Sequence, residues 1–161
     1  MSLVIDTLRT SPVTEELNEA EIELLSALFE VREYKDGDII VQPKDDHPDN
    51  LYILASGEIE VKIESGGEES AVHVLKPGDL AGMITFAGGA ATQISATLYA
   101  VGSTKVVSME RVRFETLINS HPMLVYRVMR GIIRNMHGIV RRVNIESAEL
   151  TNYIYKTGGR Y

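Results

Sequence analysis

The 161-residue chain contains no cysteine, and it has no long apolar run. Without cysteine there is no disulfide, thiolate zinc site, iron–sulfur cluster or cysteine nucleophile. No stretch reaches the roughly 20 uninterrupted apolar residues that a bilayer span needs. The opening run MSLVIDTLRT lacks the basic region and apolar core of a signal peptide. We therefore expect a cytoplasmic protein without a membrane-bound part.

Positive charge is also scarce, since the formal net charge is −7 and the pI is about 5.1. Duplex binding is driven largely by cationic side chains, so the composition argues against a general nucleic-acid binder. With 44% apolar and 24% charged residues, the chain has the composition of an ordinary globular protein. Its length suits one domain and leaves little room for a second one that catalyses or reads DNA.

The periodicity of the chain changes twice. Amphipathic spacing in the opening part predicts one or two short helices over residues 14–30. Short β-branched runs follow, and helical spacing returns after Met109. We divide the chain into an N-terminal extension, a β-barrel with flanking helices, a C-terminal dimerisation helix and a frayed tail: 1–13, 14–120, 121–155 and 156–161.

Glycines mark the expected ends of the strands. Ser56-Gly57-Glu58 separates LYILA from IEVKI, and Ser65-Gly66-Gly67 follows the second run. Glycine supplies the positive φ of tight turns, so we expect sequential antiparallel hairpins. The runs ISATLYAV and STKVVSME are predicted as the last two strands. Together these patterns indicate a mainly β fold with helices at its flanks.

The predicted C-terminal helix carries an apolar stripe at spacings of three and four residues, and such a stripe is typical of half a coiled coil. We predict a homodimer across it, because the helix looks too long for so small a barrel to cover. The alternative is that the stripe packs on the chain's own barrel. The predicted interface residues are Val125, Val128, Ile132, Met136, Ile139 and Val143.

The same helix has five arginines and no acidic residue between His121 and Val143. One interpretation is a docking surface for an acidic protein partner, and the other is a solvated flank paired with the chain's own carboxylates. The arginines are Arg127, Arg130, Arg134, Arg141 and Arg142.

Two motifs give the sequence a family likeness. The run Leu51-Tyr52-Ile53-Leu54 with Ser56-Gly57-Glu58, and the run Pro77-Gly78-Asp79-Leu80-Ala81-Gly82, together resemble the cyclic nucleotide-binding domain of catabolite-activator-type (Crp/Fnr-like) regulators. The resemblance covers about residues 20 to 145. It implies a double-stranded β-helix (jelly-roll) barrel and a sensor function. Full-length regulators of this family continue into a helix-turn-helix, which is missing here, so we expect no direct DNA binding.

The resemblance also implies a ligand pocket, and there the sequence departs from the family. Nucleotide-binding members have a Glu where this chain has Met83, and an Arg before the Ser/Thr-Ala pair where it has Ile94. A phosphate buried without a cationic partner loses several kcal/mol of solvation. We therefore predict that the usual cAMP or cGMP grip is lost. The pocket candidates are Gly82, Met83, Ile84, Thr92, Gln93, Ile94, Ser95 and Thr97.

Three functions stay open at this point. The leading hypothesis is a stand-alone sensor or regulatory module whose pocket takes an apolar or neutral ligand. The second is a protein-interaction module with a pocket filled by its own side chains, and the third is a divergent cyclic-nucleotide binder. The four histidines are far apart in sequence, and no nucleophile and base pair by spacing. We therefore expect no enzyme, no metal site and no certain cofactor.

Overall fold

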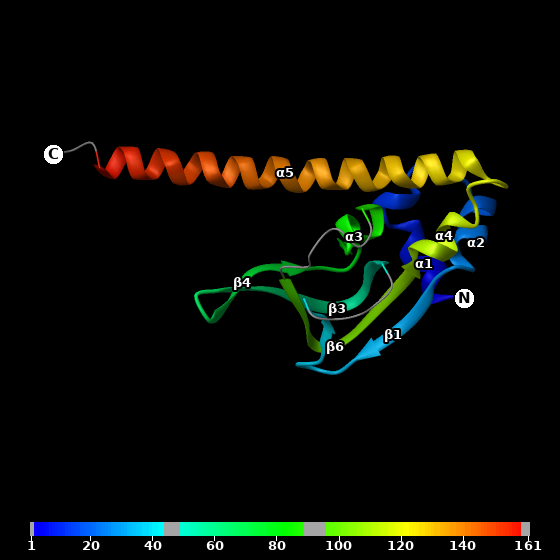
Figure 1. Ribbon diagram of the computed structural model, residues 1–161, viewed down its shortest axis with the longest axis horizontal. Helices are drawn as coiled ribbons and strands as arrows, with labels where there is room; N and C mark the ends of the chain where they lie inside the picture. Colours follow the sequence, from blue (N-terminus) through cyan, green and yellow to red (C-terminus); the bar gives the residue numbers. More distant parts are fainter. Residues whose placement is uncertain (1, 44–48, 89–95, 159–161) are drawn as a thin grey trace.

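The computed structural model describes residues 2–43, 49–88 and 96–158, and it describes no side chain for residues 84 and 155–158. Six strands form one antiparallel sheet that closes into the jelly roll of Figure 1. The strands are β1 (Glu30–Tyr34), β2 (Ile39–Val41), β3 (Asn50–Ser65), β4 (Glu68–Leu75), β5 (Leu80–Ala81) and β6 (Ala96–Glu110). The helices are α1 (Leu3–Arg9), the 3-10 turn η1 (Pro12–Thr14), α2 (Glu19–Ser26), α3 (Met83–Gly88), α4 (Arg111–Glu115) and α5 (Pro122–Gly158).

The sheet is built on two long strands, β3 and β6, which pair from Asn50 opposite Glu110 to Ile63 opposite Ala96. Strand β1 pairs with β6, and β4 pairs with β3, so the order is β1-β6-β3-β4. The short strands β2 and β5 pair with β6 and β3. The mainly β fold with flanking helices is confirmed.

One of the two predicted turns is a bulge within a long strand. Ser56-Gly57-Glu58 shifts the register of β3 without ending it, and Gly57 has a φ of +89°. A side chain at Gly57 would meet the Ser103 carbonyl of β6 at 2.5 Å, so the close approach also requires glycine. The predicted pair of final strands is likewise one strand, β6. The turn at Gly66-Gly67 is a true hairpin, with φ of +63° and +85°.

Strand β3 separates two apolar cores, which explains its uninterrupted apolar run. Leu51 and Ile53 face the core beneath the helices, whereas Tyr52 and Leu54 face the core inside the barrel. Successive side chains of a strand point to opposite faces, so a strand covered on both sides has no polar alternation.

The N-terminal residues are part of the first core. Leu8 of α1 and Val13 of η1 are fully buried, so the segment from Leu3 to Thr14 packs into the fold. The capping box between Asn18 and Glu21 fixes the start of α2 within the predicted helical segment. The opening helices and α4 gather at one end of the barrel (Figure 1).

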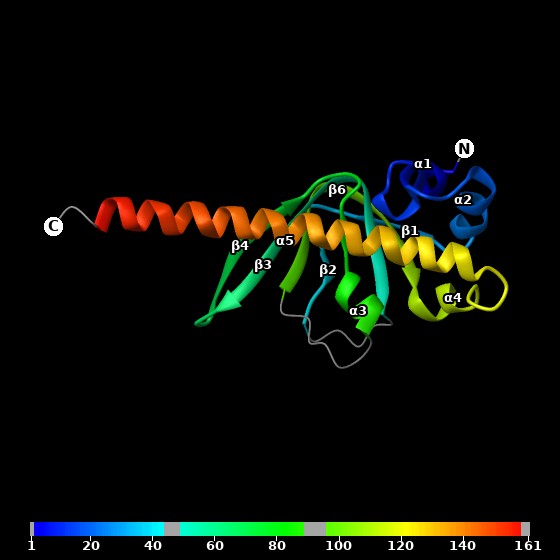
Figure 2. The same cartoon turned by 90° about the horizontal axis from the view of Figure 1, so that it is seen from above.

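Helix α5 passes over the barrel and continues beyond it, as Figure 2 shows from above. Its first half is held by Leu124, Val128 and Ile132, which are buried in the first core. All residues from 141 to 154 are exposed. The helix runs to Gly158, so the first three residues of the predicted frayed tail are helical, and residues 159–161 lie outside the described residues. No helix among the described residues is long and apolar enough to cross a membrane.

Candidate functional site

A groove of about 490 Å³ lies between α5 and the barrel. One wall is α5, and the opposite wall is β4 with the turn that follows it, while η1 closes one end. The lining residues are Pro12, Glu15, His73, Leu75, Asp79, Leu80, Arg134, Asn135, Gly138, Ile139 and Arg142.

The barrel wall of the groove is fixed by the turn between β4 and β5. Asp79 accepts a hydrogen bond from the backbone N–H of Lys76 at 2.8 Å, and Gly78 turns the chain with a φ of +94°. The Gly78 N–H donates to the Leu54 carbonyl at 2.8 Å, and the Leu54 N–H donates to the Asp79 carbonyl at 3.1 Å. The Pro-Gly-Asp motif therefore holds the groove wall on strand β3.

The helical wall is held by close contact with η1. A Cβ atom at Gly131 would lie 2.5 Å from the Pro12 carbonyl oxygen and 2.9 Å from the Val13 Cα. The backbones of α5 and η1 therefore touch at a position where only glycine fits.

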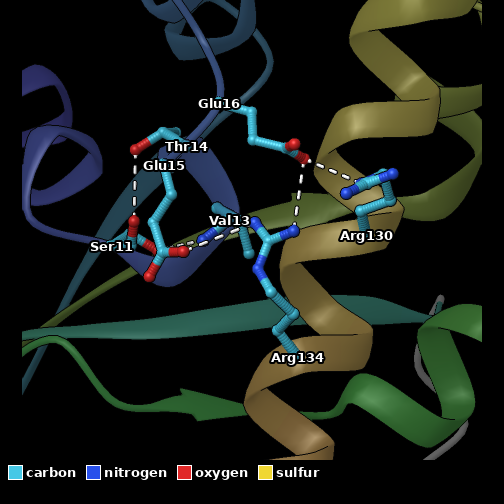
Figure 3. Close-up of polar contacts among 7 residues, drawn as sticks. All are labelled: Ser11, Val13, Thr14, Glu15, Glu16, Arg130 and Arg134. Atoms are coloured by element: carbon cyan, nitrogen blue, oxygen red, sulfur yellow. Dashed lines mark hydrogen bonds and ion pairs between the residues drawn. The ribbon is translucent and has the colours of Figure 1, made fainter.

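Ion pairs reinforce this contact (Figure 3). Glu16 accepts from Arg130 at 3.1 Å and from Arg134 at 3.3 Å, and Glu15 lies 3.4 Å from Arg134. A hydrogen bond from Arg130 to Tyr126 and the charge of Glu16 raise the pKa of Arg130. These groups are substantially exposed, so each pair adds only modestly to stability.

Two polar groups of the groove lack an expected partner: a buried side-chain oxygen has no hydrogen-bond donor, and a guanidinium has no described carboxylate beside it. The Asn135 Oδ1 atom is buried without a hydrogen-bond partner. Arg142 contacts the His73 ring, with Nη2 and Nε2 3.4 Å apart, and forms no ion pair with a described carboxylate.

The pocket predicted from sequence is described only in part. Gly82, with a φ of +76°, packs against the Asn50 backbone and the Tyr52 ring, and Met83 packs half-buried against the first core. Thr97 is buried in β6 opposite Lys62. Ile84 lies in α3, but its side chain is outside the described part of the chain. Thr92, Gln93, Ile94 and Ser95 lie wholly outside the described residues.

The predicted dimer stripe requires correction in its first half. Val128 is 0% and Ile132 is 1% exposed, because both pack in the chain's own core, and Val125 packs against that core. Met136 also packs against this core, so the alternative of packing on the chain's own domain holds for these four residues. Ile139 lines the groove, whereas Val143 is 52% exposed.

The predicted acidic-partner surface is also largely occupied within the chain. Arg130 and Arg134 pair with Glu15 and Glu16 as described, and Arg127 lies 3.4 Å from Glu21 of α2. Pairing with the chain's own carboxylates therefore accounts for three of the five arginines. Arg141 and Arg142 are exposed and form no ion pair with any described residue.

Sequence reasoning missed His73 and Asn135. His73 stands in a strand with no family motif around it, so no signal in the sequence marked it. Asn135 did leave a signal in the sequence. It is a polar residue on the inward face of α5, where Val128, Ile132 and Ile139 are apolar. Within the described part of the chain, no three His, Asp or Glu side chains converge as a metal site would require.

A family model described as the cyclic nucleotide-binding domain matches residues 31–121. No curated protein matches the chain by sequence. Similar solved structures include the N-terminal domain of a transcriptional regulator from Streptomyces coelicolor A3(2), with 21% identity and a TM-score of 0.71 over 83% of this chain and 94% of that one.

The catabolite activator protein of Thermus thermophilus is 25% identical, with a TM-score of 0.68 over 85% of this chain and 63% of that one. A cyclic nucleotide-binding domain from Methylobacillus flagellatus kt is 15% identical, with a TM-score of 0.75 over 87% of this chain and 78% of that one. The matched family model covers more than half of the sequence, and it includes both motifs around β3 and β5. The chain therefore belongs to the cyclic nucleotide-binding domain family, with the fold of Crp-like regulatory domains.

Proposed function

We propose that this domain is a sensor in which a small ligand enters the groove between α5 and β4, and in which α5 carries the signal. The observation behind this proposal is that α5 forms one whole wall of the groove. A ligand there contacts the output element directly. Occupancy shifts the helix if the ligand binds one helix position better than another. We propose no catalytic role.

We further propose that the usual cyclic-nucleotide grip is absent. Met83 stands at the position of the family's Glu, and its side chain packs on the apolar core. Ile94 stands at the position of the family's Arg. Neither side chain can supply the charge or the hydrogen bonds that offset the desolvation of a phosphate.

Thermal unfolding with and without cAMP, cGMP and AMP tests this part. A ligand at about 100 times its Kd stabilises the native state by about 2.7 kcal/mol. For a chain of this size, that energy raises Tm by roughly 5–11 °C. We expect no shift with any of the three nucleotides. A clear shift with cAMP or cGMP alone would show that the grip survives in another form.

The output of the sensor is proposed to be a homodimer through a second apolar face of α5. We call this face the outer seam, and its residues repeat strictly at three and four: Tyr126, Met129, Ile133, Met136, Val140, Val143, Leu150 and Ile154, with Ser147 in register. Met129 and Met136 are half-buried, and each of the other six apolar residues is more than half exposed. A regular apolar seam of four heptads supports a coiled coil with a second copy.

Neighbouring isoleucines give a matched test of the outer seam. Ile133 is 63% exposed and Ile132 is 1% exposed. Ile133→Asp is expected to yield folded monomers, because it places a charge in the seam only. Ile132→Asp is expected to unfold the domain, because it buries an unpaired charge. Molar mass by light scattering and far-UV circular dichroism distinguish the two results.

The exposed Arg141 lies off the outer seam, so Arg141→Asp serves as the control and should keep the wild-type mass. An Ile133→Asp variant that remains dimeric would refute the seam. A monomeric wild-type protein would favour the second candidate function, a protein-interaction module whose outer seam takes a different chain. That candidate is supported by the exposed outer seam.

A further inference from the structure

One guanidinium of the groove, that of Arg142, forms no ion pair with a described residue. The two carboxylates of the groove are both engaged, because Glu15 pairs with Arg134 and Asp79 accepts from the Lys76 backbone. Arg142 lines the same groove, and its one hydrogen-bond contact is with the ring of His73. No carboxylate among the described residues balances this guanidinium.

Arg142 and His73 come from opposite walls of the groove. Arg142 lies on α5, and His73 lies on β4, opposite Val61 of β3. Their nitrogen atoms are 3.4 Å apart, so an oxyanion that accepts from the Arg142 guanidinium would also lie beside the His73 ring. This position differs from that of the family's phosphate grip, which the sequence places at Met83 and Ile94.

The groove also contains a buried hydrogen-bond acceptor and an apolar lining. The Asn135 Oδ1 atom has no partner, and a buried acceptor of this kind costs stability until a donor reaches it. Leu75 and Leu80 are almost fully buried in the barrel wall, and Ile139 faces them from α5. A groove of about 490 Å³ is in the usual range for small-molecule sites.

We propose that the groove binds an amphipathic organic anion, with its acidic group on Arg142 beside His73, its apolar body against Leu75, Leu80 and Ile139, and a hydrogen-bond donor at Asn135. The inference rests on the proposed sensor function and specifies the ligand class of the same groove. It concerns a different place from the pocket around Met83 and Ile94, for which the sequence suggested an apolar or neutral ligand.

Two fluorescent probes test this ligand class on the full chain. 8-Anilinonaphthalene-1-sulfonate has an apolar body, an N–H donor and a sulfonate, and N-phenyl-1-naphthylamine has the same body and donor without the sulfonate. NMR chemical shifts of the Gly138 and His73 amides establish whether each probe occupies the groove. Affinities are then compared in Arg142→Gln, in Asn135→Ala and in Arg141→Gln, which changes the neighbouring arginine outside the groove.

Arg142→Gln is expected to weaken the sulfonate probe about tenfold and to leave the neutral probe unchanged. A tenfold loss corresponds to about 1.4 kcal/mol, close to the lower end for a hydrogen bond to a charged group. Asn135→Ala should weaken both probes several-fold, and Arg141→Gln should affect neither.

The outcomes separate this inference from the proposed function. If the neutral probe binds in the groove and Arg142→Gln leaves the sulfonate probe unchanged, the anionic ligand class is wrong and the sensor groove stands. If Asn135→Ala leaves the affinity of both probes unchanged, the proposed hydrogen bond from the ligand to Asn135 is wrong. If neither probe shifts the groove amides of the wild-type protein, the groove takes no such ligand, and both the inference and the proposed function fail.

Discussion

The contact between α5 and η1 allows a sharp prediction with an internal control. Gly131 and Gly138 lie seven residues apart on the same side of α5. A Cβ at Gly131 would meet backbone atoms of Pro12 and Val13 at 2.5 and 2.9 Å, whereas a Cβ at Gly138 has no neighbour within 4 Å. We expect Gly131→Ala and Gly138→Ala to have opposite effects on stability.

The magnitudes follow from two terms. Replacing a mid-helix glycine by alanine gains up to about 1 kcal/mol of helix propensity, and both variants receive this gain. Only Gly131→Ala forces two backbones apart, and overpacking of this kind costs about 1–3 kcal/mol. Because the propensity term is common to both, the difference between the variants is the steric cost alone.

Paired thermal unfolding measures that difference. For 161 residues, about 1–3 kcal/mol corresponds to a Tm gap of roughly 2–12 °C, with Gly138→Ala the more stable variant. A gap in the unfolding free energy should appear equally in urea titrations with an unchanged m-value. Equal Tm values for the two variants would refute the close approach of α5 to η1 and, with it, our account of what positions the helical wall of the groove.

Two further predictions concern polar contacts. Glu16→Gln removes the carboxylate that Arg130 and Arg134 share. We therefore expect a lower Tm in dilute buffer and a weaker dependence of Tm on salt concentration. A variant whose Tm depends on salt as strongly as that of the wild type would contradict the ion pairs. A hydrogen bond to Glu69 raises the pKa of Tyr99, and the stability this contributes is complete below about pH 10 and is lost as pH rises through the higher value of the folded state. The stability difference between wild type and Tyr99→Phe, from denaturant unfolding, should therefore be constant at neutral pH and should decrease above pH 10.

The barrel could be predicted because its signals are local. The motif from Leu51 to Glu58 and the motif from Pro77 to Gly82 lie within single strands and turns. Their residues form the same strand and turn conformations in any member of the fold. The predicted turn at Gly57 failed for a related reason, because glycine at positive φ serves both hairpins and bulges. Only the length of the partner strand β6 decides between them.

Helix α5 could be predicted as a helix, but its faces could not be assigned. Val128 and Ile132 point to the core, whereas Tyr126 and Ile133 point to solvent, and these two stripes lie side by side around the helix. Spacings of three and four residues fit both stripes. The predicted interface therefore combined members of each. The position of the barrel, which no local pattern contains, separates them.

The groove could not be predicted, because its groups come from distant parts of the chain. His73 and Arg142 are 69 residues apart, and Glu16 and Arg134 are 118 residues apart. Arg134 both lines the groove and pairs with Glu15 and Glu16, which directly follow η1. A ligand in the groove would therefore contact the Arg134 guanidinium, which also attaches α5 to the segment that follows η1. A ligand that displaces Arg134 alters that attachment, and this gives the proposed sensor a direct physical route from occupancy to the position of its output helix.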